Sequence, residues 1–197
     1  EVINYALDND MYVIINIHWD GGWLDQPFYE DQEDLNERLG IMWKQIAKFF
    51  RDYDDHLLFA GTNEVHITGD YSDPDQENVD VQNSFNQTFV NTVRATGGRN
   101  TYRHLVVQTF NTNIAHGVNY FSVPQDETKD RMMVEVHFYD PYQFALEENG
   151  SSYLWGSENA SSDAHSGWGD EDWIDKAFGD VKTNFVDDGY PIILGEY

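Results

Sequence analysis

Cysteine is absent from the 197-residue sequence, which excludes disulfides and thiolate metal sites. Long hydrophobic runs are missing as well. No stretch of about 18 apolar residues could cross a bilayer as a helix. No basic region followed by an apolar segment marks a signal peptide at the N-terminus. The sequence therefore predicts no membrane partner.

Basic residues are scarce. Only 11 Lys and Arg stand against 36 Asp and Glu, which gives a formal net charge of -25 at pH 7. A surface of this charge repels nucleic acid, so no nucleic-acid partner is expected. Because aromatic residues make up 15% of the chain, the composition is not that of a disordered acidic tail. Acidic surfaces are also used by halophiles, so salt tolerance is a hypothesis beside that of an ordinary acidic protein.

Several chemical motifs are also missing. The sequence has no Gly-x-Ser-x-Gly elbow, no Gly-x-Gly-x-x-Gly or phosphate loop, and no His-Glu-x-x-His pair. Asp73, Asp75 and Glu77 resemble the start of a calcium loop, but Asn78 stands where such a loop requires glycine. A nucleotide cofactor and a metal are therefore not expected.

The chain does contain five short apolar runs, and they are continuous rather than alternating. Such runs are typical of parallel strands buried on both faces, and helical patterns at residues 34–50, 81–93 and 171–186 separate several of them. The order predicts an α/β fold, and no linker divides it, so residues 1–197 are read as one domain. The expected strands are residues 12–17, 57–60, 105–110, 132–138 and 192–194.

Polar side chains follow every one of these expected strands. In a parallel barrel the carboxyl ends of the strands converge on one face, and the active sites of barrel enzymes are built there. One or two such residues could arise by chance, but all five strands deliver them. They are His18 after the first strand, Asn63 and Glu64 after the second, Gln108 and Asn111 at the third, His137 and Tyr139 at the fourth, and Glu196 at the fifth.

Two of these residues, Glu64 and Glu196, form a natural pair. Glycosidases use a pair of carboxyl groups in catalysis. A lone glutamate after a strand, in contrast, is more often a helix-capping partner. The shared location favours the catalytic interpretation. The charge of Glu196 is expected to raise the pKa of Glu64, as a general acid requires. Trp23 and Trp155, in loops, are the preferred platforms for sugar rings, whereas Trp43 and Trp173, on helices, are assigned to packing.

Five segments carry a resemblance to a known family. "IINIHWDGGWL", "GTNEV", "VVQTFNTN", "VHFYDPYQF" and "PIILGEY" resemble glycoside hydrolase family 5, in particular its endo-β-1,4-glucanases that include xyloglucan and mixed-linkage glucan cleavers. The resemblance implies a (β/α)8 TIM barrel, a retaining double displacement and no cofactor. It also implies that Glu64 is the acid/base and Glu196 the nucleophile. His18, Asn63, His137 and Tyr139 would contact substrate or orient the nucleophile.

The sequence departs from the family pattern in three ways. Trp19 follows His18 where a second polar residue is usual, and Val65 follows Glu64 where proline is common. Only about five of the eight β/α units, the third to the seventh, are recognisable, and the family's strand-two arginine and strand-eight tryptophan are not found. We therefore expect the chain to be an internal part of a longer catalytic domain.

The predicted function is that of a retaining endo-acting hydrolase of β-1,4-linked glucan. Its substrate would be a polysaccharide such as cellulose, carboxymethylcellulose, mixed-linkage glucan or xyloglucan. An extracellular or cell-surface location is expected with it. Two alternatives stay open: a β-mannanase on the same fold, and a non-catalytic carbohydrate-binding barrel.

Overall fold

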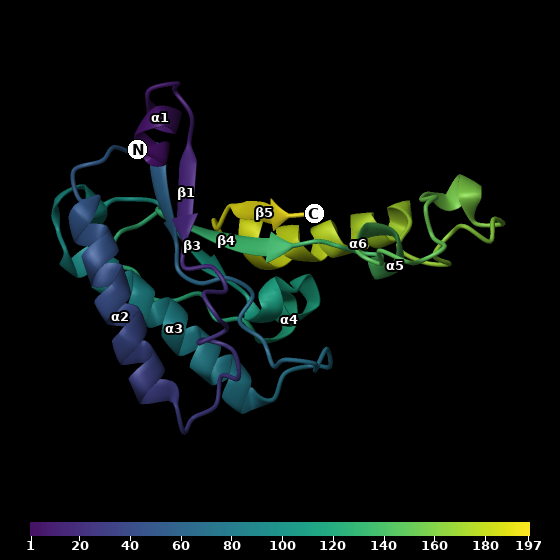
Figure 1. The fold of residues 1–197 in the computed structure, drawn as a ribbon, viewed down its shortest axis with the longest axis horizontal. Coiled ribbons are helices and arrows are strands. Elements are labelled where there is room, and N and C mark those ends of the chain that lie inside the picture. Colours follow the sequence, from purple (N-terminus) through teal and green to yellow (C-terminus); the bar gives the residue numbers. More distant parts are fainter.

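A computed structural model describes all residues, 1–197. Five parallel strands form one sheet in chain order, so each strand pairs with its neighbour in the sequence (Figure 1). The five predicted strands are confirmed, and half of their ends differ from the prediction by one or two residues. They are β1 (Val13–Asn16), β2 (Leu57–Ala60), β3 (Leu105–Gln108), β4 (Met132–His137) and β5 (Ile192–Glu196).

Helices alternate with the strands. The three predicted helices are confirmed, and η4 extends α6 without a break. A shorter helix, α4, lies between β3 and β4 and has no clear counterpart in the apolar pattern. The helices are α1 (Val2–Leu7), α2 (Gln32–Phe49), α3 (Gln76–Ala95), α4 (Ile114–Tyr120), α5 (Tyr142–Ala145) and α6 (Glu171–Val181), with short segments η1 (Gly98–Thr101), η2 (Phe110–Thr112), η3 (Ser157–Asn159) and η4 (Lys182–Val186).

The start of α3 shows how local sequence sets an element. Asp75 precedes the helix in an extended conformation, and its backbone N–H donates to the side-chain oxygen of Asn78 at 3.1 Å. This is one half of a capping box, which satisfies a backbone donor that the helix leaves free. The amide of Asn78 also donates to the backbone oxygen of Pro27 at 3.1 Å. Asn78 therefore serves the helix start.

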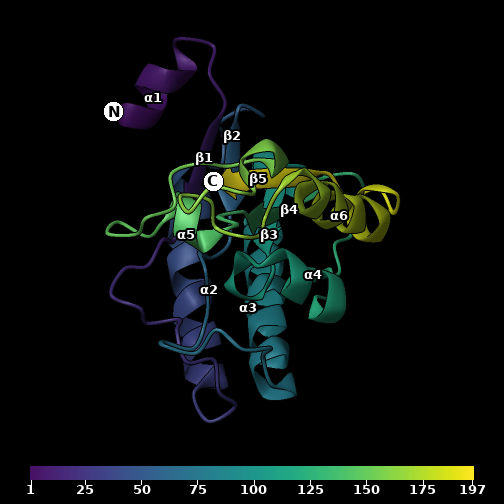
Figure 2. The same cartoon turned by 90° about the vertical axis from the view of Figure 1, so that its right-hand side faces the viewer.

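The main hydrophobic core lies between the sheet and the paired helices α2 and α3, which run side by side (Figure 2). Trp43 of α2 is fully buried there, packs against Phe59 and Phe89, and donates its indole N–H to the backbone oxygen of Gly61 at 2.8 Å. A Cβ atom at Gly61 would lie 2.7 Å from Phe89. Glycine at this position therefore allows the sheet and α3 to pack closely.

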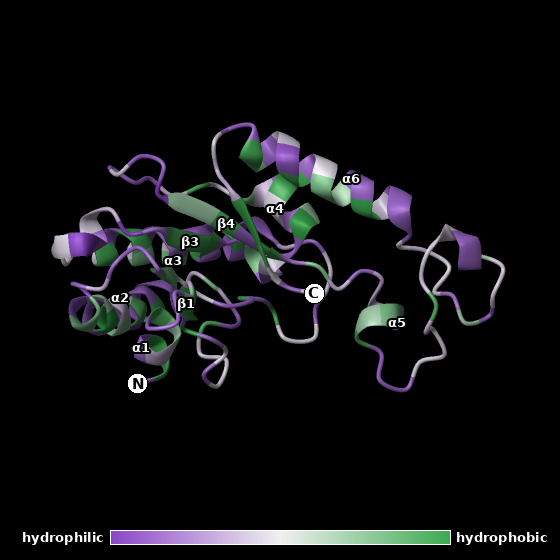
Figure 3. Cartoon of the chain, turned by 90° about the horizontal axis from the view of Figure 1, so that it is seen from above, coloured by the Kyte–Doolittle hydropathy of each residue, from purple (hydrophilic) through white to green (hydrophobic).

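The sheet forms an open half-barrel. Every residue of β2 and β3 is buried, whereas β1 and β5, which have a partner on one side only, are partly exposed. Residues 146–170, between α5 and α6, extend away from the sheet on the side toward which β4 points (Figure 1). Apolar and polar residues alternate along α6 (Figure 3), and its Ala177 and Val181 are buried. No helix is long and apolar enough to cross a membrane.

Replacement of Trp43 by alanine tests the position of the core. Trp43→Ala should lower the free energy of unfolding by about 3–5 kcal/mol, because it leaves a cavity and an unpaired carbonyl. Phe49, on the same helix, is 74% exposed, so Phe49→Ala should change stability by no more than about 0.5 kcal/mol. Urea unfolding of the full-length protein measures both, and equal losses would contradict this placement of the core.

Candidate active site

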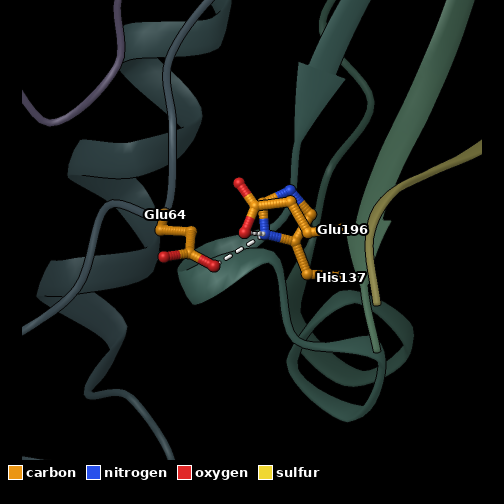
Figure 4. A group of neighbouring side chains, drawn as sticks. All are labelled: Glu64, His137 and Glu196. Carbon is orange, nitrogen blue, oxygen red and sulfur yellow. Dashed lines mark hydrogen bonds and ion pairs between the residues drawn. The ribbon is translucent and has the colours of Figure 1, made fainter. Parts of the chain in front are cut away.

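The carboxyl ends of β2, β4 and β5 bring Glu64, His137 and Glu196 together (Figure 4). Nδ1 of His137 lies 2.6 Å from Oε1 of Glu64 and 3.6 Å from Oε2 of Glu196. One side-chain oxygen of each glutamate and one ring nitrogen of the histidine all lie within 4.8 Å of one another. The imidazole is almost fully buried, whereas about a third of each carboxylate side chain is exposed. Both glutamates are thus partly open to solvent.

A bulge in β5 directs Glu196 toward this group. Val136 pairs with Leu194, but His137 pairs with Glu196, so Gly195 is an extra residue in β5. Paired residues of neighbouring strands lie on the same face of a sheet. Without the bulge, Glu196 would share the face of Phe138, which packs against Phe178 of α6. The bulge therefore moves this carboxylate to the face of His137, as bulges near active sites often do.

Tyr139 contacts Glu196 directly. Its hydroxyl donates to Oε2 of Glu196 at 2.7 Å. This hydrogen bond raises the pKa of Tyr139 to about 12, because an ionised phenol could no longer donate to the carboxylate. Oε2 of Glu196 therefore accepts a hydrogen bond from Tyr139 at neutral pH.

The backbone of Glu64 is held in an unusual conformation. Its φ is +47°, in the left-handed region that side chains other than glycine seldom adopt. The N–H of Glu64 donates to the side-chain oxygen of the buried Gln108 at 3.0 Å, and Nδ1 of His66 lies 2.6 Å from its backbone oxygen. Gln108 ends β3. The sequence places it at a strand end, and the structure shows that it fixes the peptide of Glu64.

Two further predicted residues, His18 and Asn63, are linked through Asn16. The amide of Asn16 lies 3.5 Å from Nδ1 of His18 and 3.4 Å from the side-chain oxygen of Asn63. Asn16 is the last residue of β1. No expected role attaches to it in the sequence, although a polar residue closing an apolar run is the signal that could have identified it.

The charge on His137 reverses one expectation. Burial lowers the pKa of His137, but hydrogen bonds to Glu135 and Glu64 and the charge of Glu196 prevail and raise it to about 9. The hydrogen bond from His137 in turn lowers the pKa of Glu64, against an opposing effect of burial. The predicted rise in the pKa of Glu64 is therefore wrong for this structure, because an imidazolium lies beside the two carboxylates.

The spacing of this group would also allow a cation to bridge it. A histidine must offer a lone pair to bind a metal. With a pKa of about 9, His137 carries protons on both ring nitrogens at neutral pH. The arrangement therefore fits an acid–base unit better than a metal site.

The tryptophans singled out in the sequence lie in different surroundings. Trp23 is half-buried against the core, and the guanidinium of Arg38 lies 4.1 Å from its ring centroid, so its role as a sugar platform stays a prediction. Trp155 is half-buried and donates its indole N–H to Gly169 at 2.8 Å, which anchors its loop. Trp19, next to His18, is 61% exposed. Trp43 is buried as predicted. Trp173 is 40% exposed, but its ring packs edge to face against Trp168 and its indole N–H donates to Asp140 at 2.9 Å, in keeping with its assignment to packing.

Comparison with known proteins identifies the class. The family model described as Cellulase (glycosyl hydrolase family 5) matches residues 1–197. The chain therefore belongs to glycoside hydrolase family 5, and its five parallel strands form part of a (β/α)8 TIM barrel. The predicted family and fold class are confirmed.

The particular relatives include several glucanases. The chain is 50% identical over 99% of its length to the xyloglucan-specific endo-β-1,4-glucanase BoGH5A of Bacteroides ovatus, and spans 39% of that protein. It is 37% identical to endoglucanase A of Paenibacillus barcinonensis, with all of this chain and 53% of the relative covered. The chain thus spans about two fifths to one half of these curated relatives.

Solved structures agree with this assignment. The Bacteroides ovatus family 5 xyloglucanase, in complex with a XXXG heptasaccharide, superposes with a TM-score of 0.94 at 51% identity, over 99% of this chain and 42% of that one. A family 5 xyloglucanase from Paenibacillus pabuli, in complex with ligand, superposes with a TM-score of 0.93 at 39% identity. The match covers 98% of this chain and 58% of that one.

The raised pKa of His137 predicts a pH-dependent stability. A raised pKa in the folded state gives stability that is complete below the unfolded value of 6.5 and lost as pH rises through about 9. The loss should approach about 3 kcal/mol. Urea unfolding of the full-length protein between these pH values measures it. The variant His137→Gln should lack this decline, and an identical decline in both proteins would refute the assignment.

Proposed function

We propose that residues 1–197 carry the acid/base and the nucleophile of a retaining endo-β-1,4-glucanase. The observation that supports this most is the meeting of Glu64 and Glu196 at one imidazole, with a carboxylate oxygen of each inside a group no more than 4.8 Å across. Retaining glycosidases hold their carboxyl groups about 5 Å apart, whereas inverting enzymes need about 6.5–9.5 Å to fit a water. The spacing favours the retaining reaction.

In this proposal Glu196 is the nucleophile and Glu64 the acid/base. Oε1 of Glu196 attacks the anomeric carbon while Glu64 donates its proton to the glycosidic oxygen, so the glycosidic bond breaks as the ester bond forms. A water then enters, and Glu64 takes its proton as the water attacks the anomeric carbon and releases Glu196. Tyr139 keeps Oε2 of Glu196 hydrogen-bonded meanwhile.

Because the pKa of Glu64 is lowered, the source of the proton that it donates in the first step must be considered. Glu64, His137 and Glu196 interact so strongly that they titrate as one unit. The form competent for the first step places a proton on Glu64, whose Oε1 lies 2.6 Å from the protonated Nδ1 of His137. His137 is therefore the neighbour that can share its proton with the acid.

The substrate class follows from the relatives. One is named a xyloglucan-specific endo-β-1,4-glucanase, and others are named endoglucanases. Structures of relatives hold a XXXG heptasaccharide and XXLG. We therefore assign a β-1,4-linked glucan backbone, with xyloglucan the first polymer to test. Because such polymers are too large to enter a cell, we place the working enzyme outside it.

Conservative substitutions test the two glutamates. In the full-length protein, Glu64→Gln should lower kcat by about 10²–10⁴-fold, the usual contribution of a general acid/base. Glu196→Gln should retain substrate binding and lose nearly all turnover, because an amide cannot act as the nucleophile. Glu147→Gln, in the exposed loop after α5, is the matched control and should keep the parent rate. Near-normal turnover in Glu196→Gln would contradict the assignment of Glu196 as the nucleophile.

A substrate panel separates the remaining alternatives. Xyloglucan, carboxymethylcellulose, mixed-linkage glucan and mannan are incubated side by side with the full-length protein, and reducing ends are measured. Cleavage of glucans with the β-configuration of the first product, seen by proton NMR, is expected. Cleavage of mannan alone would indicate a β-mannanase. Binding without release of reducing ends would indicate a non-catalytic barrel.

A further inference from the structure

Glu135 is a buried acid that the proposed reaction does not use. It lies on β4 two residues before His137, so both side chains are on the same face of the sheet. Only 10% of its side chain is exposed. Its Oε1 lies 3.3 Å from Nε2 of His137, and its Oε2 is buried without any hydrogen-bond partner. A buried carboxylate is costly unless it is paired, so this single contact needs an explanation.

Gly195 leaves room for this contact. A Cβ atom at position 195 would overlap Oε1 of Glu135 and lie 3.0 Å from Nε2 of His137. The φ of Gly195 is not in the left-handed region, so the position requires glycine for space rather than for backbone freedom. The residue next to Glu196 is thus shaped to admit Glu135.

The charged groups around His137 come from several elements. Glu135 faces it from β4, Glu64 from the loop after β2, and Glu196 from β5. On a further side, His137 borders a small cavity of about 110 Å³ that Asp140 and, from α6, Lys176 and Asp180 also line. Glu135 is the carboxylate that reaches Nε2, whereas Glu64 and Glu196 both face Nδ1.

We propose that Glu135 is a positioning residue that acts through His137. By accepting a hydrogen bond from the Nε2–H of His137, it keeps the imidazole doubly protonated and directs the Nδ1–H group toward Glu64 and Glu196. A neutral ring would be free to carry its proton on either nitrogen and could offer Nδ1 as an acceptor. Glu135 thereby determines how the acid/base and the nucleophile are charged, without touching the substrate.

The kinetic part of this inference rests on the proposed function. The pKa of His137, which is the first readout, can be measured whether or not the protein has that function. The pKa of His137 is measured by NMR titration of its ring in the full-length protein. Glu135→Gln keeps the size of the side chain and removes the charge, so the pKa should fall by about one unit or more. Glu135→Asp keeps the charge and should give an intermediate value. Glu127→Gln, an exposed change before β4, should leave it unchanged.

Kinetics provide the second readout. In Glu135→Gln, kcat on the glucan substrate should fall by about tenfold or more, and the pH–rate profile should shift in the same direction as the pKa of His137. KM should change little, because Glu135 is buried beneath the site. Glu135→Asp should recover part of the rate. An unchanged His137 pKa together with an unchanged profile in Glu135→Gln overturns the inference. Full activity in Glu64→Gln or Glu196→Gln instead overturns the proposed function and leaves the NMR result standing.

A second variant reaches Glu135 from the other strand. In Gly195→Ala the new methyl group should displace the carboxylate and lower the pKa of His137 in the same way as Glu135→Gln. Gly179→Ala is the matched control, because nothing lies within 4 Å of the added Cβ and Gly179 is helical. A normal His137 pKa in folded Gly195→Ala would show that Glu135 does not need this space, and would overturn this part of the inference.

Discussion

The imidazole of His137 is the group on which the rest of the candidate site depends. It is buried, it is the last residue of β4, and it contacts three carboxylates at once. Its positive charge allows Glu64 and Glu196 to lie closer than two anions would otherwise remain. Removal of that charge would leave two carboxylates facing each other at the open end of a sheet. The close approach of the two glutamates therefore depends on the charge of this histidine.

The parallel sheet supplies the precision that this arrangement needs. β2, β3, β4 and β5 each place a group of the site at the same end of the sheet, and Gln108 fixes the strained peptide of Glu64 from β3. Behind the sheet, Trp43 and its aromatic neighbours bind α2 and α3 to β2. Positioning of this kind is what catalysis by charge requires, because groups that must move to react lose much of their effect.

Much of the fold was predictable from sequence, because continuous apolar runs and helical spacing are strong local signals. The pairing of Glu64, His137 and Glu196 in space followed from their common place at strand ends, although their roles stay predictions. Other features depend on contacts between strands. The packing of Arg38 on Trp23, the tie of Asn16 to Asn63, and the effect of His137 on the pKa of Glu64 arise from residues far apart in the chain, so no local pattern reveals them.

The bulge at Gly195 shows that the direction of the Glu196 side chain depends on the number of residues before it in β5 as well as on residue type. Glu196 faces the histidine only because one residue more than the regular ladder requires precedes it in β5. The ladder continues beyond the bulge, where the N–H of Phe138 donates to the backbone oxygen of Glu196 at 3.0 Å. A strand can therefore change the face on which a side chain lies while its backbone hydrogen bonds continue, and the carboxylate of Glu196 lies on a hydrogen-bonded strand instead of a loop.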